Sequence, residues 1–92
     1  MKRVGMVVHG GHPEAVAAAG TVREWSLEHG IACKDIDVWD DGDRRSAREE
    51  VAAAGDPDLV VTLGGDGTFL RGARLAAAAD ALVLGVDLGR VS

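Results

Sequence analysis

A five-residue segment in the second half of the chain carries the most distinctive chemistry of the sequence. It consists of Gly64, Gly65, Asp66, Gly67 and Thr68, and it lies between an apolar run and a helical pattern. Glycine has no Cβ, so backbone amides in such a turn approach an anion closely. Parallel α/β sheets bind ligands beyond the carboxyl ends of their strands, and the free amides at a helix start attract phosphate. The segment is therefore predicted to be a phosphate-binding turn.

Asp66 is unexpected in such a turn because its negative charge repels a phosphate. Two functions would justify it: accepting a proton from an attacking hydroxyl group, or holding Mg²⁺ beside the phosphates. A third interpretation is that the carboxylate only caps the following helix, which we expect to begin near Thr68. The residues alone leave the functional and the capping interpretations open.

Two common nucleotide-binding loops do not account for the segment. A P-loop ends in Gly-Lys followed by Ser or Thr, and the dinucleotide fingerprint has the spacing Gly-x-Gly-x-x-Gly. Neither pattern matches the residues from Gly64 to Thr68. The segment therefore belongs to a different kind of nucleotide site.

The elements that position this turn follow from the apolar periodicity. Short runs rich in Val and Leu predict strands at residues 4–8, 31–38, 59–63 and 82–86, and three- and four-residue spacings predict helices at 14–29, at about 45–54 and from about 68 onward. Charges in the second strand favour a sheet edge for it, whereas the fourth resembles a central strand. The alternation predicts an α/β fold: a three-layer, doubly wound, mainly parallel sheet of about four strands, with helices on both faces.

Two of these helices show an apolar stripe that we expect to face the core. The first stripe consists of Ala15, Ala18, Val22 and Trp25, and the second of Leu70, Ala73 and Ala77. Gly30 is placed to end the first helix in a left-handed cap. Because aromatic residues make up only 3% of the chain, the core is predicted to depend on small side chains and close helix–sheet approach.

The bulk properties exclude several classes of function. A chain of 92 residues forms one small domain, and its 47% apolar content argues against disorder. The net charge of −5 offers no basic face for nucleic acid, and no run approaches the roughly 18 apolar residues of a membrane span. Cys33 is the only cysteine, so no internal disulfide is possible. We expect a cytoplasmic protein without nucleic-acid or membrane partners.

Two longer segments give the sequence a family resemblance. From Val60 to Arg74 it reads Val-Val-Thr-Leu-Gly-Gly-Asp-Gly-Thr-Phe-Leu-Arg-Gly-Ala-Arg, which closely resembles the signature segment of bacterial NAD kinases. The stretch from Leu84 to Arg90 is similar to that family's second segment, which usually has Asn at the position of Asp87. The first strand and helix fit as well, so the resemblance covers nearly the whole chain. The turn alone would be less specific, because lipid kinases and phosphofructokinases carry similar loops.

The resemblance implies a fold like the N-terminal domains of NAD kinases and phosphofructokinases. It also implies ATP-dependent phosphorylation of the adenosine ribose 2′-hydroxyl of NAD to give NADP. By this resemblance Asp66 is the proton acceptor, and Asp66, Gly67 and Arg71 contact NAD. The part that meets the phosphoryl donor is matched by Gly64, Gly65 and Thr68. A divalent metal such as Mg²⁺ is expected with ATP, and no residue is assigned as a dedicated metal ligand.

The sequence also departs from the family pattern. The family continues into a Gly-Phe pair and a β-rich domain whose Asn-acidic pair holds NAD, whereas this sequence contains no Asn and stops at Ser92. We therefore expect residues 1–92 to form the N-terminal α/β nucleotide-binding domain without the C-terminal β-rich NAD-binding domain. The isolated chain is expected to be inactive. Asp87 in place of Asn puts a charge among the local ligand contacts.

Two other functions are weighed against this one. A lipid kinase catalytic domain of the diacylglycerol or sphingosine type would carry a similar loop, but the sequence Arg-Gly-Ala-Arg from Arg71 argues against it. A non-catalytic nucleotide-binding or assembly module would need only the phosphate-binding turn. The partners expected in every case are small-molecule nucleotides. Absence of a partner domain would expose apolar surface and a strand edge, so a homo-oligomer is expected too.

The remaining polar and aromatic candidates have simpler interpretations. Histidines in the first loop, His9 and His12, are expected to be structural. The arginines Arg44, Arg45 and Arg48 stand beside two glutamates and are expected on a solvated helix face. We interpret Cys33 as a small buried hydrophobic residue, Trp39 as partly exposed after the edge strand, and Asp40–Asp43 as an acidic turn.

Overall fold

The structure, a computed structural model, describes residues 2–37 and 47–87. Its elements are β1 (Arg3–Val8), α1 (Pro13–Glu28), β2 (Ala32–Asp37), α2 (Ala47–Ala53), β3 (Leu59–Gly64), α3 (Asp66–Ala79) and β4 (Leu82–Asp87). All seven predicted elements are present close to their expected bounds, and Gly30 ends α1 with a positive φ of 67° as predicted.

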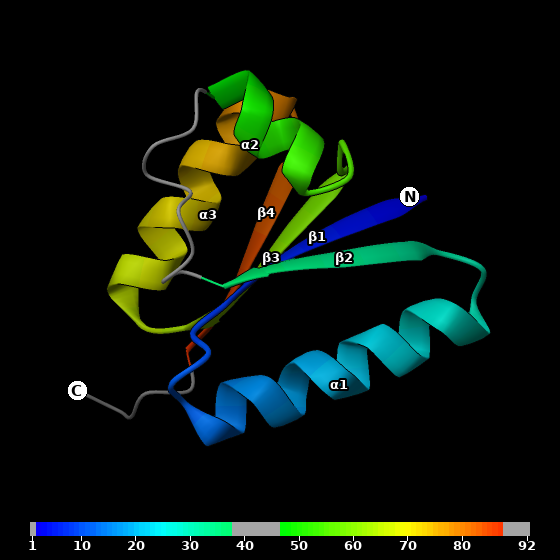
Figure 1. Ribbon diagram of the computed structural model, residues 1–92, viewed down its shortest axis with the longest axis vertical. Helices are drawn as coiled ribbons and strands as arrows, with labels where there is room; N and C mark the ends of the chain where they lie inside the picture. The colour runs from blue at the N-terminus through cyan, green and yellow to red at the C-terminus, as the bar shows by residue number, and fades with distance from the viewer. Residues whose placement is uncertain (1, 38–46, 88–92) are drawn as a thin grey trace.

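The four strands form one parallel sheet in the order β2-β1-β3-β4. Helix α1 lies on one face of this sheet, and α2 and α3 lie on the other (Figure 1). The predicted doubly wound α/β architecture is therefore confirmed, as is the edge position of β2. Strand β4, which resembles a central strand in sequence, forms the second edge of the described sheet. Its apolar composition, which suggested a central strand, leaves side chains exposed there.

The core is divided between the two faces of the sheet. On the α1 side the buried cluster consists of Val4, Met6, Val8, Ala15, Ala19, Val61 and Leu63. On the α2 and α3 side it consists of Val7, Ile36, Ala54, Val60, Leu75 and Ala76. Among the described residues, neither cluster contains an aromatic side chain, and alanine supplies most of the helical part. The helices therefore pack close to the sheet, as the composition predicted.

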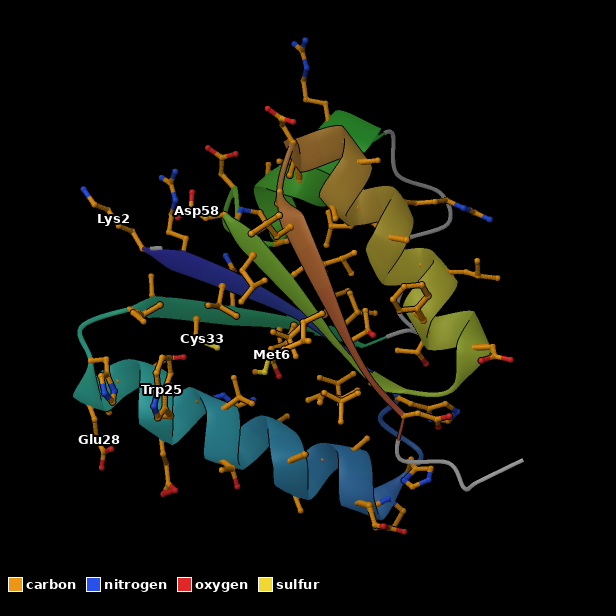
Figure 2. All side chains as sticks on the ribbon, turned by 180° about the vertical axis from the view of Figure 1, so that it is seen from behind. Lys2, Met6, Trp25, Glu28, Cys33 and Asp58 are labelled. Carbon is orange, nitrogen blue, oxygen red and sulfur yellow. The ribbon has the colours of Figure 1, made fainter. Side chains whose placement is uncertain are left out.

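Helix α1 faces the sheet with most of its predicted apolar stripe, since Ala15 is buried and Ala18 and Val22 pack against the same core, but Trp25 does not. The side chains of Ala15, Ala19 and Ser26 are buried, whereas Trp25 is 48% exposed. The Trp25 ring instead stacks on His29, with ring centroids 4.3 Å apart, toward the end of the helix (Figure 2). The prediction that Trp25 packs in the core is wrong, because small residues at a four-residue spacing let the helix approach the sheet where an indole would not fit.

Helix α3, in contrast, is rotated relative to the prediction. Leu70 and Ala77 are exposed, and the buried face consists of Thr68, Gly72, Leu75 and Ala76. Gly72 explains the rotation, because a Cβ at this position would overlap Cγ2 of Thr62 on β3. The helix therefore contacts β3 through a residue without a side chain, and the apolar stripe that includes Leu70 faces away from the sheet.

At the amino-terminal ends of the strands, Asp58 ties the start of β1 to the start of β3. Its Oδ2 accepts hydrogen bonds from the backbone N–H groups of Lys2 at 2.9 Å and Arg3 at 3.0 Å. Figure 2 shows Lys2 and Asp58 together at this end. The two amide donors, with a smaller contribution from the Arg3 guanidinium, lower the pKa of Asp58 from its ordinary value of 3.8. This carboxylate joins residues far apart in the sequence.

Among the residues that the structure describes, no helix combines the length and apolarity needed to cross a lipid bilayer.

Candidate functional site

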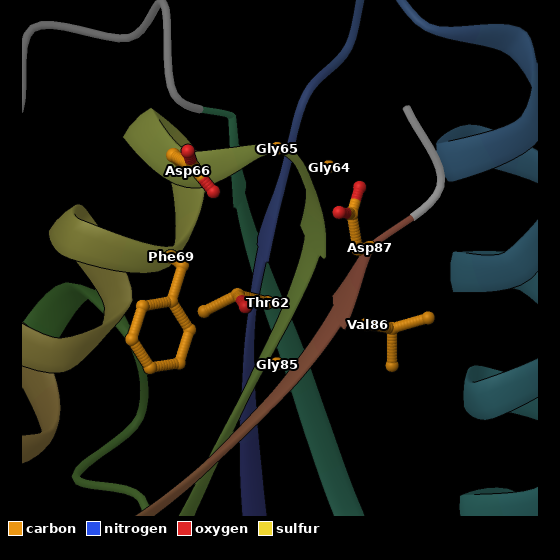
Figure 3. A pocket seen from close by; sticks show the side chains of 8 residues that line it. All are labelled: Thr62, Gly64, Gly65, Asp66, Phe69, Gly85, Val86 and Asp87. Carbon is orange, nitrogen blue, oxygen red and sulfur yellow. The ribbon is translucent and has the colours of Figure 1, made fainter. Parts of the chain in front are cut away.

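The carboxyl ends of β3 and β4 border a pocket of about 240 Å³ (Figure 3). Its lining residues come from β3, the start of α3 and β4: Thr62, Gly64, Gly65, Asp66, Phe69, Gly85, Val86 and Asp87. Pockets that enclose a whole drug-sized ligand are larger, with volumes of roughly 300–1,000 Å³. The pocket therefore has room for part of a nucleotide, such as a phosphate or a ribose, while the rest of the ligand would extend outside it.

The turn between β3 and α3 depends on Gly64. A Cβ at this position would lie 2.6 Å from Oγ1 of Thr68 and 3.2 Å from Cβ of His9. Such contacts are shorter than van der Waals separations, so a side chain at Gly64 would push the turn away from the sheet. Thr68, buried beneath the turn, thus fixes how closely the start of α3 approaches the end of β3. The glycine predicted for anion approach is also required by packing.

Asp66 is the first residue of α3. The N-cap residue is Gly65, so Asp66 does not occupy the capping position, and the interpretation of its side chain as an N-cap is wrong. The sequence pattern placed the start of the helix near Thr68, but the helix begins two residues earlier. The exposed carboxylate of Asp66 lines the pocket beside the first amides of the helix. Those unpaired amides carry the partial positive charge of the helix end, which stabilises negative groups there.

Asp87 brings a second carboxylate to the same pocket. It pairs in register with Gly64 at the end of β4, and Figure 3 shows the two carboxylates on opposite sides of the turn. Among the described residues that line the pocket, none is a lysine or an arginine. A phosphate would therefore depend on backbone amides, and the two carboxylates offer oxygen ligands of the kind that Mg²⁺ prefers. The described residues contain no cluster of three or more His, Cys, Asp or Glu side chains suited to a metal.

The inner wall of the pocket is formed by residues that sequence reasoning did not select. The Phe69 ring lies against Gly85 of β4, where a Cβ would stand 2.6 Å from Cδ1 of the ring. Thr62 is buried between them and the turn. An isolated glycine within a strand pattern signals close approach by another group, and a threonine within an apolar strand is a second signal. Both were present at Gly85 and Thr62.

Three of the predicted binding residues do not line the pocket. Gly67 is exposed in the first turn of α3, and Thr68 is buried beneath it. Arg71 lies on the side of α3 that faces α2, where its Nη2 is 3.2 Å from Oε1 of Glu50. Both side chains of this ion pair are largely buried, at 17% and 14% exposure. The structure therefore brings together Gly64, Gly65 and Asp66 but places Arg71 apart from them.

The other polar candidates take up positions near the site or away from it. His9 and His12 stand edge to face with ring centroids 6.3 Å apart, and His9 lies close to Gly64 of the turn. Arg48 is exposed on α2, and Cys33 is partly buried on β2, where desolvation raises the pKa of its thiol. The predictions for Trp39, Asp40–Asp43, Arg44 and Arg45 concern positions outside the described residues.

The parallel sheet and the pocket at its carboxyl edge define an α/β domain of the class that binds its ligand beyond the strand ends. The sequence matches the ATP-NAD kinase N-terminal domain over residues 4–92. The chain therefore belongs to the ATP-NAD kinase family.

Named relatives agree with this assignment. The chain is 74% identical to NAD kinase 1 of Streptomyces coelicolor over 91 residues, an alignment that covers 99% of this chain and 25% of the relative. It is 73% identical to NAD kinase 1 of Streptomyces avermitilis over 97% of this chain and 25% of the relative. The NAD kinase of Mycolicibacterium paratuberculosis is 41% identical over 94% of this chain and 33% of its own length. The chain thus spans about a quarter of its two Streptomyces relatives.

Proposed function

We propose that this domain supplies the ATP-facing half of an NAD kinase active site, in which the adenosine ribose 2′-hydroxyl of NAD is phosphorylated by ATP to give NADP. Family membership supports the reaction, and the position of Asp66 supports the assignment of residues. Its carboxylate is exposed, lines a pocket sized for a ribose or phosphate, and stands where helix amides stabilise negative charge. This placement of Asp66 is the observation that carries the proposal.

Asp66 acts as the general base in this proposal. It accepts the proton of the ribose 2′-hydroxyl while that oxygen forms a bond to the γ-phosphorus of ATP and the bond from that phosphorus to the β,γ-bridging oxygen breaks. The products are NADP, ADP and protonated Asp66, which returns its proton to water. The amides of the turn from Gly64 to Thr68 face the donor phosphates, and their partial positive charge stabilises the transferring group.

The residues of the pocket fit the divalent cation that accompanies ATP. Asp87 supplies a carboxylate beside the base Asp66, and Mg²⁺ commonly binds one or two carboxylates together with phosphate oxygens and water. The cation would offset the repulsion between these carboxylates and the phosphates. By the resemblance, the family usually has Asn at the position of Asp87. This chain therefore adds one unit of negative charge to the side of the pocket formed by β4.

The residues outside the pocket have separate proposed roles. Gly67, exposed next to Asp66, contacts NAD at the mouth of the pocket, and Thr68 supports the turn from below. Arg71 contacts NAD only if its guanidinium leaves Glu50, so we assign its NAD contact to the assembled enzyme. The β-rich domain with the NAD-holding Asn-acidic pair is provided by the further polypeptide of the family. We place the reaction in the cytoplasm, because the one cysteine within these 92 residues gives no sign of a disulfide framework.

A chimera tests the proposed role of Asp66. In it, this chain replaces the aligned 25% of Streptomyces coelicolor NAD kinase 1. The chimera is expected to form NADP from NAD and ATP–Mg²⁺, and Asp66→Asn is expected to lower kcat by roughly 10²- to 10⁴-fold, the usual contribution of a general base. ATP binding, measured by calorimetry, should change little because the turn amides remain.

Asp80→Asn provides the matched control, because it makes the same chemical change at the other end of α3, away from the pocket. Its kcat should equal that of the unmodified chimera. A chimera that keeps its kcat after Asp66→Asn would refute the proposed base. The 92-residue chain alone is expected to produce no NADP. If it binds ATP–Mg²⁺ while every chimera is inactive, the non-catalytic nucleotide-binding module becomes the better description. The expected homo-oligomer stays a prediction, which sedimentation velocity tests.

A further inference from the structure

Strand β4 exposes more apolar surface than any other described strand. Leu82 is 72% exposed and Leu84 is 54% exposed, and Val83 is also exposed. The inner strands β1 and β3 are buried along nearly their whole length. Folded domains rarely leave three consecutive large apolar residues in contact with water. Exposed apolar surface of this kind commonly marks an interaction site.

The exposed leucines belong to the face of the sheet that α1 covers only in part. Val86 packs against the core cluster on the α1 side, and side chains alternate along a strand, so Leu84 and Leu82 point to that same side. Helix α1 packs against β1, β2 and β3, and Figure 1 shows it crossing the sheet away from β4. The core on this side therefore continues into an uncovered stripe of Leu82, Leu84 and Val86, which we call the β4 stripe.

The two edges of the sheet differ in a way that points to a covered β4. The β2 edge carries exposed Lys34 and Asp35, and charges of this kind prevent further strands from pairing. The β4 edge has no charge until Asp87 at its end. Alternate backbone groups of β4 also point away from β3 and have no strand beside them in the described sheet. Only the β2 edge has the residues that natural sheets use to stay unpaired.

We propose that the β4 stripe and the free edge of β4 are the docking surface for the polypeptide that follows this domain in ATP-NAD kinases. The two Streptomyces relatives are about four times as long as the segment they share with this chain. That segment is the N-terminal domain of the family, so a large polypeptide follows it in the relatives. The docked segment pairs a strand with β4 and places apolar side chains over Leu82 and Leu84. This inference rests on family membership and does not depend on the proposed reaction.

Cysteine labelling tests this surface in the chimera with Streptomyces coelicolor NAD kinase 1. Leu84→Cys and the control Leu27→Cys are made with Cys33→Ser, so that each variant has one engineered thiol within the domain. Leu27 is 81% exposed on α1, on a surface that the proposal leaves in water. A thiol-specific reagent should modify both variants at similar rates in the 92-residue chain. In the chimera the Leu84→Cys thiol should react at least roughly tenfold more slowly. Burial of a leucine-sized side chain favours the docked state, which hides the thiol, over the open state by about that factor or more.

Each other result would overturn the proposal. Equal labelling of Leu84→Cys in the chain and in the chimera would mean that the stripe stays in water. Slow labelling of Leu84→Cys in the isolated chain that does not speed up on dilution would mean that the domain itself already covers the stripe.

A second measurement does not require the chimera to fold. Amide hydrogen exchange of the natural Streptomyces coelicolor NAD kinase 1 should show protection throughout the strand aligned with Leu82–Asp87, including the amides that point away from β3. In the 92-residue chain the outward amides of β4 should exchange fast while β3 stays protected. Fast exchange at the outer amides in the natural relative would also refute docking. Neither readout involves turnover, so the docking surface and the proposed reaction can fail independently.

Discussion

Asp66 and Asp80 place negative charges at the two ends of one helix, where they have opposite consequences. Asp66 is in the first turn of α3, beside the partial positive charge of the free amides. Asp80 follows the last turn as the C-cap with a φ of 55°, beside the partial negative charge of the free carbonyls. The first charge therefore stabilises the helix and the second destabilises it. Asp66 thus supports the local structure even though it repels phosphate.

The two aspartates predict a paired difference in stability. Asp66→Asn is expected to lower the free energy of unfolding by about 0.3–1 kcal/mol at low ionic strength, and Asp80→Asn to leave it unchanged or raise it by a similar amount. Asn accepts the left-handed conformation of residue 80, so the backbone there is undisturbed. Urea denaturation at neutral pH measures both values, and added salt should shrink both. Equal destabilisation by the two substitutions would contradict the charge–dipole explanation.

At the same scale, the sequence predicted the turn of the site but not its wall. Gly64, Gly65 and Asp66 were found because a glycine turn between a strand and a helix is recognisable from local sequence. Phe69 and Gly85 were not, because they meet only through the rotation of α3 over β4. Local patterns do not encode that rotation. The same limitation explains why the ion pair between Arg71 and Glu50 could not be anticipated.

Helix α3 shows which properties of a single element can be predicted from sequence and which cannot. Its existence and approximate bounds were predicted from the apolar spacing, yet its buried face was assigned to the wrong side. The choice depended on Gly72, a residue that carries no hydrophobic signal and acts by letting α3 approach Thr62. Trp25 on α1 illustrates the converse case, since its strong hydrophobic signal does not correspond to burial. Side-chain volume therefore decided the orientation of α3 and the exposure of Trp25 more than hydrophobicity did.

Two helical glycines predict opposite responses to the same substitution. Gly72→Ala places a methyl group into Thr62, so it is expected to lower the free energy of unfolding by about 1–3 kcal/mol, as overpacking does. Gly20 on α1 has no atom within 4 Å of an added Cβ. Gly20→Ala should therefore raise the free energy of unfolding by about 0.5–1 kcal/mol through helix propensity. Chemical denaturation of both variants checks the pair, and a stabilising Gly72→Ala would show that α3 is not in close contact with β3.

At the scale of the whole molecule, topology explains both the success and the limit of the fold prediction. Alternating strands and helices indicated a doubly wound sheet, because few other architectures accommodate that order. The place of β4 in the strand order was left open, because that order depends on which strands pair and pairing is not encoded within one strand. Its apolar composition fits a covered strand, which is why the β4 stripe is interpreted as a docking surface. At the opposite end of the sheet, Asp58 holds the start of β1 against β3.

Asp58 predicts how the stability of the molecule depends on pH. The folded protein lowers its pKa below 3.8, mainly through the amide of Lys2 and then that of Arg3. A depressed folded pKa means that the unfolded chain binds the proton first as the pH falls. The contribution of Asp58 is therefore complete above the unfolded pKa and is lost as the pH falls through the lower, folded pKa. Asp58→Asn should be less stable than the natural chain at neutral pH, and the gap should narrow below about pH 4.

Thermal unfolding of the natural chain and of Asp58→Asn across this pH range measures that gap. Asp56→Asn is the matched control, because Asp56 also lies near the Arg3 guanidinium, at 3.8 Å, but its exposed side chain is not the one that accepts the two amide bonds. Its unfolding temperature should follow that of the natural chain closely at every pH. A gap for Asp58→Asn that widens on acidification would mean that the unfolded chain holds the proton less tightly than the folded one. Neither the two amides nor the Arg3 guanidinium could then dominate at Asp58, because both favour its charged form.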